Sequence, residues 1–181
     1  MTEPAQQQHF ADRLALQQVD RDIFTGWCHS GSPLRAYGGQ IAAQSLMAAG
    51  RTIDQDDRRV HSLHGYFLRP GDPSKPILYD VDRIRDGKSF STRRVVAIQN
   101  GRAIFNLQAS FHVPEAGLDY QQPFPLDVPA PETLPDFKER MEPLKAQLGD
   151  ILDRPRPIDL RYVSVDPLSR GGVHAETQQV W

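Results

Sequence analysis

The sequence is poor in the residues that mark disulfide-rich and strongly charged proteins. Its single cysteine, Cys28, cannot close an intrachain disulfide or supply a cysteine-based zinc site. This excludes small disulfide-stapled secreted domains and zinc ribbons, and it fits a reducing compartment. The formal net charge of −2 provides no overall cationic field that would gather nucleic acid or an anionic membrane. We therefore expect no nucleic-acid partner.

Long hydrophobic runs are also missing. Apolar runs such as residues 95–98 end after a few residues, whereas a membrane-spanning helix needs roughly 20. Residues 1–22 contain acidic side chains and no apolar stretch of signal-peptide length. From these features we expect no export signal, no membrane span and a cytoplasmic protein.

The patterns that are present predict one helix and an antiparallel meander. Residues 38–50 carry good helix formers between a glycine pair and a closing Gly50. The dipeptides Asp86-Gly87 and Asn100-Gly101 favour tight hairpin turns between extended runs. Those runs, rich in β-branched and aromatic residues, are 23–29, 60–68, 77–85, 89–99 and 102–113.

The last run alternates between apolar and polar residues. One face carries Ala103, Phe105, Leu107, Ala109, Phe111 and Val113, and the other carries Asn106, Gln108, Ser110 and His112. The helix at 38–50 is the only nearby element able to cover the apolar face. The expected fold class is therefore α+β, with an antiparallel sheet wrapped around one central helix.

Prolines predict where the first domain ends. Six of the 15 prolines lie between Pro114 and Pro135, a density that opposes helix and sheet and favours an extended connector. Beyond it, a helix is expected to begin at Asp136 and to be kinked or split by Pro143. The predicted organisation is an N-terminal segment at 1–22, a domain at 23–113, a linker with a short helix at 114–157, and the start of an incomplete second domain at 158–181.

The glycine pair Gly38-Gly39 is the first candidate for chemistry. It opens the helix, so unpaired backbone N–H groups could face an oxygen that develops negative charge. The alternative is a tight turn packed against the sheet. Residues 40–49 contain no Asp, Glu or His, so this helix has no general base of its own.

Other reactive residue types give weaker signals. His61 and His64 are three residues apart and would face opposite sides of an ideal strand, so we expect no metal site and no cofactor. Cys28 is expected to be a small buried hydrophobe rather than a reactive thiol. The basic residues of the meander either bind the phosphates of a nucleotide-like ligand or form a solvated strand face. They are Arg83, Arg85, Lys88, Arg93, Arg94 and Arg102.

Three segments in order resemble the amino-terminal half of the acyl-CoA thioesterase II family. They are Tyr37-Gly38-Gly39-Gln40, the stretch HSLHGYFLRPG at 61–71 and the stretch RDGKSFSTRRV at 85–95. The similarity extends through 97–101 and 108–111 and resumes faintly at 178–181.

This resemblance implies a double hot dog fold, in which two tandem repeats each wrap a sheet around a helix and lie side by side as one continuous sheet. The domain at 23–113 would be the first repeat, and the second would be incomplete at Trp181. Members hydrolyse acyl-CoA to free fatty acid and coenzyme A without a covalent intermediate. The Asp, Ser or Thr, and Gln that activate the water lie in their second repeat, so the resemblance implies no catalytic residue in this chain and places all three after Trp181.

The resemblance also implies where the first repeat contributes. The expected substrate-binding residues are Gly39, Gln40, His64, Arg85, Ser89 and Phe90. Gln108 lies roughly where the second repeat carries its catalytic Gln, which suggests an ancestral site that is now silent. The expected partners are acyl-CoA, the remainder of the second repeat and further copies packed through the hot dog sheets.

Two other functions stay open at this point. The chain could be a non-catalytic hot dog scaffold or assembly fragment. Less favoured is an acyl-thioester hydratase or dehydratase, because that chemistry needs an Asp and His pair near the helix start, which residues 40–49 do not offer.

Overall fold

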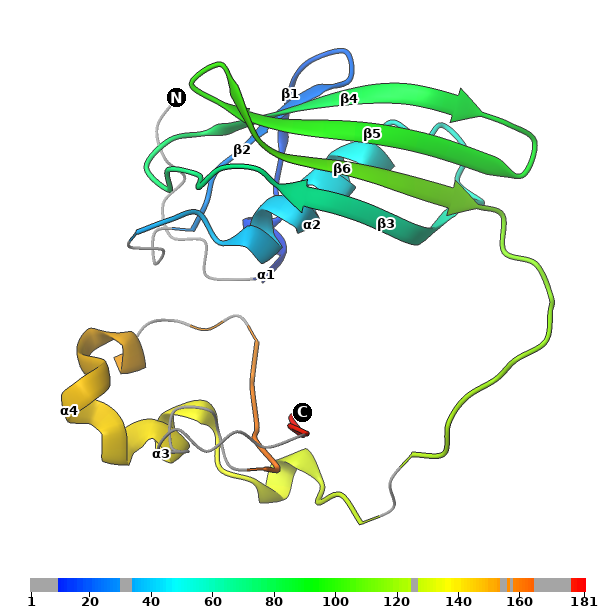
Figure 1. Ribbon diagram of the computed structural model, residues 1–181. Helices are drawn as coiled ribbons and strands as arrows, with labels where there is room; N and C mark the ends of the chain where they lie inside the picture. Colours follow the sequence, from blue (N-terminus) through cyan, green and yellow to red (C-terminus); the bar gives the residue numbers. More distant parts are fainter. Residues whose placement is uncertain (1–9, 30–33, 125–126, 154–155, 157, 165–176) are drawn as a thin grey trace. The chain divides into compact units, whose positions relative to one another are not determined.

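The computed structural model describes residues 10–29, 34–124, 127–153, 156, 158–164 and 177–181. The chain forms two compact units, Met1–Gly117 and Leu118–Trp181 (Figure 1). Each unit is described by itself.

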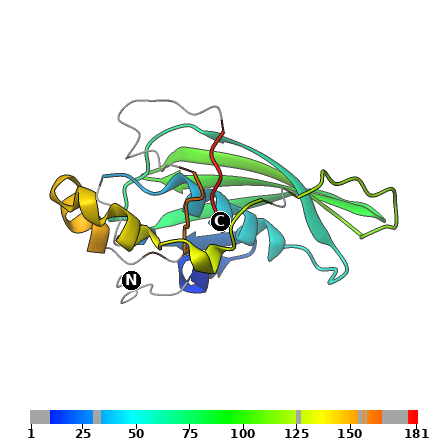
Figure 2. The same ribbon diagram turned by 90° about the horizontal axis from the view of Figure 1, so that it is seen from below.

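A six-stranded antiparallel sheet and a central helix make up the first unit. The strands are β1 (Gln17–Asp20), β2 (Ile23–Gly26), β3 (Arg59–Phe67), β4 (Ile77–Asp86), β5 (Phe90–Gln99) and β6 (Arg102–His112). Their order across the sheet is β1-β2-β4-β5-β6-β3, which leaves β3 at one edge. The 13-residue helix α2 (Gly38–Gly50) lies against one face of this sheet (Figures 1 and 2), and the short α1 (Phe10–Arg13) precedes β1. The expected α+β hot dog architecture is confirmed.

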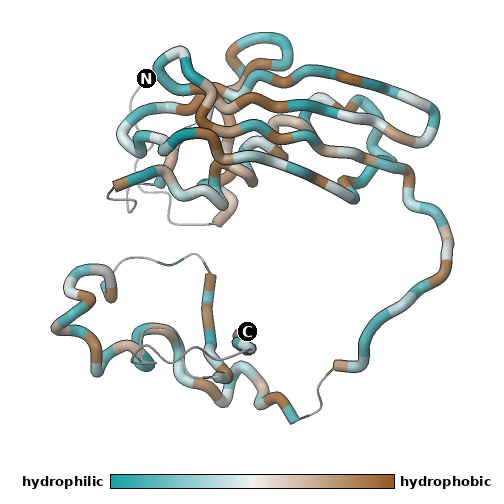
Figure 3. The backbone as a smooth tube through the Cα atoms, viewed as in Figure 1, coloured by the Kyte–Doolittle hydropathy of each residue, from teal (hydrophilic) through white to brown (hydrophobic). Residues whose placement is uncertain are grey.

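The core lies between α2 and the inner face of the sheet. Alternate residues of the middle strands are buried there, and along β6 the hydrophobic and hydrophilic colours of Figure 3 also alternate. On β6 the buried residues are Ile104, Phe105, Leu107, Ala109 and Phe111, so the expected apolar face is confirmed from Phe105 to Phe111, whereas Ala103 and Val113 are only partly buried. Ile41, Ala48 and Ala49 of α2 complete this core.

The two hairpin turns differ in construction. Asn100 (φ 50°) and Gly101 (φ 69°) both have positive φ, as the expected tight turn between β5 and β6 requires. The Asp86-Gly87 expectation is wrong in detail. Asp86 still belongs to β4, and a loop at 87–89 closes with the Gly87 N–H donating to Phe90 O. The Asp86 carboxylate is bound elsewhere, as described below.

Strand β1 lies within residues 1–22, the N-terminal segment that we expected to precede the first repeat. It pairs with β2 through a turn in which Asp22 adopts φ 60°, and Asp22 O accepts from the Val81 N–H at 2.9 Å. A residue other than glycine with positive φ gives little turn signal in a sequence. The sequence therefore missed this strand.

Two glutamines of α2 fasten the N-terminal part of the unit to the helix. The Gln44 amide donates to the carbonyls of Arg13 (2.8 Å) and Trp27 (3.1 Å) and accepts from the Tyr79 hydroxyl at 2.6 Å. Gln44 and Tyr79 are fully buried. Gln40 donates to the same two carbonyls, so the Tyr79 hydroxyl is the group that depends on Gln44 alone, and an unpaired buried polar group costs about 1–3 kcal/mol.

A buried arginine closes the opposite end of the helix. Arg93 of β5 points to the inner face with its side chain 0% exposed. Its guanidinium donates to Thr52 Oγ1 (2.8 Å) and Thr52 O (3.0 Å), just beyond the end of α2, and to Asp86 Oδ1 (2.7 Å). It also donates to the carbonyls of Arg85 and Thr92. The buried charge is thus paired and hydrogen-bonded, which such a charge requires.

A second arginine reaches the same carboxylate through a serine. Ser91 donates to Asp86 Oδ1 at 2.7 Å, and Arg58 donates to Ser91 Oγ and to Gly87 O. Burial raises the pKa of Asp86, but the hydrogen bonds from Ser91 and Arg93 outweigh it and hold that pKa below its ordinary value. This network fixes the β4–β5 loop against the sheet.

Short helices and an extended pair of segments make up the second unit. Helix α3 (Phe137–Met141) begins with a capping box between Asp136 and Glu139, and Pro143 separates it from α4 (Lys145–Leu148), so both expectations for this helix are confirmed. Three-residue and five-residue 3-10 turns occupy Pro131–Thr133, Glu142–Leu144 and Gly149–Asp153.

The region expected to start a second repeat contains an antiparallel bridge between Tyr162 and Val180. Residues 165–176 of that region lie outside the described residues, so the boundaries of the second repeat stay predictions. Across the parts of the chain with described structure, we find no helix both long and apolar enough for a transmembrane span.

We expect Gln44→Ala to lower the free energy of unfolding by about 1–3 kcal/mol, because it leaves the buried Tyr79 hydroxyl without its acceptor and removes one of the two amide donors to each of the Arg13 and Trp27 carbonyls. Urea unfolding followed by circular dichroism measures the change. Gln108→Ala is the matched control, since Gln108 is exposed, and it should change stability by less than about 0.5 kcal/mol. Equal losses in the two variants would contradict the role assigned to Gln44.

We expect Asp86→Asn to weaken the acid dependence of stability. The folded-state pKa of Asp86 lies below the ordinary value of 3.8, so its contribution is complete above that pH and is lost as pH falls through the lower folded-state pKa. Urea midpoints from neutral pH downward should therefore converge for wild type and variant only below pH 3.8. Asp82→Asn, which removes an exposed carboxylate paired with Arg94, is the control. A constant gap across the whole range would exclude this linkage.

Candidate functional site

The start of helix α2 presents backbone donors beside two aromatic rings. Tyr37 is the N-cap residue and provides no side-chain cap, so the first amides of the helix are left without an intrahelical partner. A Cβ on Gly38 would lie 3.0 Å from the Phe67 ring, and one on Gly39 would lie 2.6 Å from the Tyr37 ring. A side chain at either position would therefore displace a ring, and the present packing holds the amides of both glycines beside an apolar surface.

These rings are themselves accessible. Tyr37 is 63% exposed and Phe67 is 62% exposed, while the inner side of Phe67 packs on Phe105 with ring centroids 4.7 Å apart. An apolar group could lie against these rings while a polar atom faces the amides of Gly38 and Gly39. The sequence identified the glycine pair but not the two rings.

Gln40 has structural partners in this arrangement. Its amide donates to the carbonyls of Arg13 (2.8 Å) and Trp27 (3.0 Å) and accepts from the His29 N–H (3.1 Å). The side chain is buried and its hydrogen-bonding groups are in use. A substrate contact by Gln40, as the sequence predicted, would have to replace these bonds.

The predicted residues Arg85, Ser89 and Phe90 lie at the other end of the helix, around the β4–β5 loop. This end is defined by the hydrogen bonds between Arg93 and Thr52, whereas the start of α2 contacts Phe67. The helix has 13 residues, so its ends are about 20 Å apart. The predicted substrate-binding residues therefore form separate groups, and a single ligand would have to be extended to touch both.

Three of the six basic residues of the meander already have partners. Arg83 binds Asp22 in a two-pronged contact and reaches Asp54 at 2.9 Å. Arg94 pairs with Asp82 at 3.1 Å, and Arg93 is buried as described above. Arg85, Lys88 and Arg102 are exposed. If this cluster binds phosphate, the side chains that do so are therefore Arg85, Lys88 and Arg102.

His64 and Gln108 are paired across strands β3 and β6. Directly opposite residues point to the same side of a sheet, and this side is the outer face, away from α2. His64 packs on Tyr66, with ring centroids 4.7 Å apart. Both residues therefore lie on a different face of the sheet from the glycine pair.

A bulge in β3 changes the expected direction of His61. The pairing with β6 shifts between Val60 and Ser62, and His61 Nε2 lies 2.8 Å from Ser110 Oγ on the outer face. The expectation that His61 and His64 face opposite sides is therefore wrong, because it assumed an ideal strand without a bulge. Within the described residues, we find no group of three or more His, Cys, Asp or Glu side chains that could hold a metal ion.

Cys28 behaves as the sequence predicted. It is 2% exposed, and burial raises the pKa of its thiol to about 11, although a hydrogen bond with the Tyr37 backbone opposes this shift. A thiol with a raised pKa is a poor nucleophile at neutral pH. Cys28 is part of the core.

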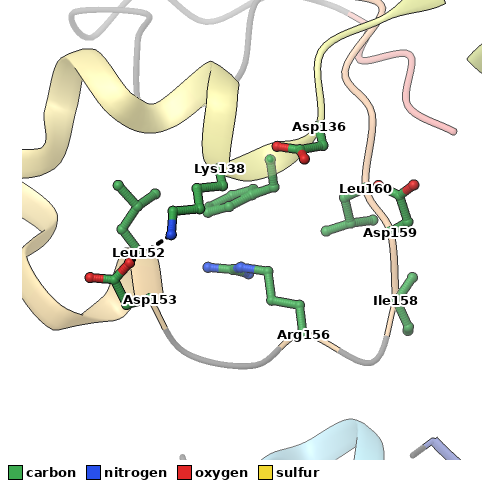
Figure 4. A pocket seen from close by; sticks show the side chains of 9 residues that line it. Asp136, Lys138, Leu152, Asp153, Arg156, Ile158, Asp159 and Leu160 are labelled. Atoms are coloured by element: carbon green, nitrogen blue, oxygen red, sulfur yellow. Dashed lines mark ion pairs between the residues drawn. The ribbon is translucent and has the colours of Figure 1, made fainter. Parts of the chain in front are cut away.

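A pocket of about 440 Å³ lies within the second unit (Figure 4). On its walls Lys138 pairs with Asp153 at 2.9 Å, and the Arg156 guanidinium lies 3.5 Å above the Phe137 ring. Asp136 is engaged in the capping box of α3. The carboxylates of Asp136 and Asp153 thus have partners, and none of the predicted site residues lines this pocket.

The first unit matches a known protein family, and the chain has curated relatives. Residues 25–112 match the family model described as the acyl-CoA thioesterase N-terminal domain. The chain is 38% identical over 181 residues to human acyl-coenzyme A thioesterase 8, covering 93% of this chain and 56% of that protein. It is 37% identical to acyl-CoA thioesterase 2 of Haemophilus influenzae, covering 85% of this chain and 51% of that protein.

Solved structures agree. The acyl-CoA thioesterase II TesB2 of Mycobacterium marinum superposes with a TM-score of 0.69 at 39% identity, covering 94% of this chain and 58% of that one. A hot dog protein from Alicyclobacillus acidocaldarius, at 20% identity and a TM-score of 0.65, supports the fold alone. The chain spans about half the length of the curated relatives it matches. These matches identify residues 25–112 as an acyl-CoA thioesterase N-terminal domain and make the chain similar, over about half of their length, to acyl-CoA thioesterases.

Proposed function

We propose that this chain provides the first hot dog domain of an acyl-CoA thioesterase, an enzyme that hydrolyses acyl-CoA to free fatty acid and coenzyme A. In this proposal the amides of Gly38 and Gly39 stabilise the negative charge that develops on the thioester oxygen. The rings of Tyr37 and Phe67 provide an apolar wall for the acyl chain. The groups that activate water come from a second hot dog domain.

One observation carries this division of labour. Helix α2 offers backbone donors at its start, yet residues 40–49 contain no Asp, Glu or His. Both of its buried glutamines are occupied by backbone carbonyls. Hydrolysis of a thioester by water needs a group that takes a proton from the water. This helix can polarise a carbonyl but cannot supply that group, and the same lack weighs against a hydratase or dehydratase.

We expect the 181-residue chain alone to release no thiol from medium- or long-chain acyl-CoA, and a longer chain that continues into a second hot dog domain to release it readily. Thiol release monitored with a chromogenic disulfide, after the intact mass has been confirmed, is the measurement. The raised pKa of Cys28 keeps the protein's own thiol from contributing. Turnover by the shorter chain clearly above background would place a working site within residues 1–181 and overturn the division of labour.

The free edge of the sheet supports the need for a second domain. Strand β3 is the last strand in the order, and eight of its nine residues are exposed. Leu63 and Phe67 lie opposite Ala109 and Phe105, so they point to the inner face, yet they are 52% and 62% exposed. An edge strand with unpaired backbone groups and exposed apolar side chains is a template for another strand. We propose that a second hot dog domain pairs here.

When no second domain is present, this edge should promote association between copies of the chain. We expect concentration-dependent self-association in sedimentation velocity, and we expect Leu63→Lys to shift the chain toward monomer, because a lysine disfavours edge pairing. Ile84→Lys is the control, since Ile84 is similarly exposed but lies on β4 inside the sheet order. A stable wild-type monomer at all concentrations, or equal effects of the two lysines, would argue against β3 as the interface.

A further inference from the structure

Two histidines from neighbouring strands meet on the outer face of the sheet. The ring centroids of His61 on β3 and His112 on β6 are 4.6 Å apart, with the ring planes at 64°. Phe90 stacks on His112 and meets the edge of His61, with centroids 6.1 Å and 5.7 Å away. The bulge at His61 creates this pair, which is why the spacing of histidines along the sequence did not reveal it.

Ser110 orients one of the two rings. Its hydroxyl lies 2.8 Å from His61 Nε2. When Nε2 carries the proton and donates to Ser110 Oγ, Nδ1 of the same ring keeps the lone pair that a metal ion needs. A histidine that binds a metal ordinarily donates its other ring N–H to an oxygen in this way. Ser110 thus has the position of an outer-shell partner.

We propose that His61 and His112 form a two-nitrogen binding site for a divalent transition-metal ion, which ties the edge strand β3 to β6. The proposal does not depend on the thioesterase function. No third protein ligand accompanies the pair among the described residues, so water completes the coordination of the ion.

The nature of the donors selects the ion. Imidazole nitrogens suit Cu²⁺, Ni²⁺ and Zn²⁺, and the affinity of such sites peaks at Cu²⁺. A Cu²⁺ ion can keep water at its remaining positions, whereas a closed Zn²⁺ site ordinarily takes four protein ligands. Cu²⁺ is therefore the appropriate probe. The charged residue opposite His112 is Arg59, and its guanidinium donates to the backbone oxygens of Asp56 and Arg58.

The rest of the domain offers a matched comparison. His64 lies on the same strand, but its described ring contact is with Tyr66 rather than with another histidine. Cys28 is buried with a thiol pKa raised to about 11, so a thiolate that could compete for copper is rare at neutral pH. A site built by His61 and His112 should therefore be separable from other binding by single substitutions.

The test is a titration of the intact 181-residue chain with Cu²⁺ alone in a non-coordinating buffer, by calorimetry and by electron paramagnetic resonance. We expect H61Q and H112Q each to weaken the strongest binding by more than about tenfold, and S110A by about tenfold, since loss of an outer-shell partner typically costs 10–100-fold. H64Q should leave it unchanged. The spectrum of the wild type should show coupling to two ring nitrogens, and that of each ligand variant to one.

Two results would overturn the proposal. One is binding by H61Q or H112Q equal to that of the wild type, and the other is a loss in H64Q as large as the loss in H61Q. Circular dichroism of each variant separates misfolding from ligand loss. The melting temperature supplies a second readout, because Cu²⁺ should raise it in the wild type and H64Q by mass action but not in H112Q.

Discussion

The placement of helix α2 depends on how its buried polar side chains are satisfied. A helix surrounded by a sheet is ordinarily apolar on the face that it buries, yet α2 buries Gln40, Gln44 and Ser45 together with its aliphatic residues. The two amides bind the carbonyls of Arg13 and Trp27, which lie just before and just after the β1–β2 hairpin. Burial of apolar side chains is non-directional, whereas these hydrogen bonds fix the position of the helix relative to the hairpin.

The opposite end of α2 is held by a different kind of interaction. Arg93 cannot stay buried unless its charge is paired, and it finds Asp86 on one side and Thr52 on the other. The helix is thus fixed by neutral amides near its start and by an ion pair past its end. Gly38 and Gly39 owe the position of their amides to both. Preorganised donors are effective only when they do not move as charge develops, so these structural bonds serve the proposed chemistry directly.

Local sequence signals predicted the elements and failed where a distant partner decides the outcome. The helix at 38–50 was predicted with the bounds that it has, because glycine marks both ends. The face of β6 and the break at Pro143 also follow from residue spacing alone. The roles of Gln40 and Arg93 do not, because a glutamine in a helix and an arginine in a strand are ordinarily solvated. Only the folded structure shows which carbonyl groups bind Gln40 and which carboxylate binds Arg93.

The same limit applies at the candidate site. Gln40 and Arg85, both expected to bind substrate, lie at opposite ends of helix α2. A one-residue bulge then moves His61 to the side of Ser110 and His112, which strict alternation cannot anticipate. Registers and bulges are set by pairing with another strand, so they are properties of the sheet rather than of a segment.

The lack of an Asp or Glu in residues 40–49 of α2 and the exposed edge strand β3 both fit a domain that works together with a second one. A domain that evolved to act alone would be expected to cover apolar side chains such as Leu63 and Phe67 and to blunt its edge with lysine or proline, and β3 carries neither. It would also need a proton acceptor near the start of its helix. This domain instead leaves Phe67 exposed beside the glycine amides, at the point where edge and helix start meet. In the proposed function, a second domain docked on β3 would cover that ring and bring its own side chains to those amides, so the assembly that hides the apolar edge would also complete the chemistry.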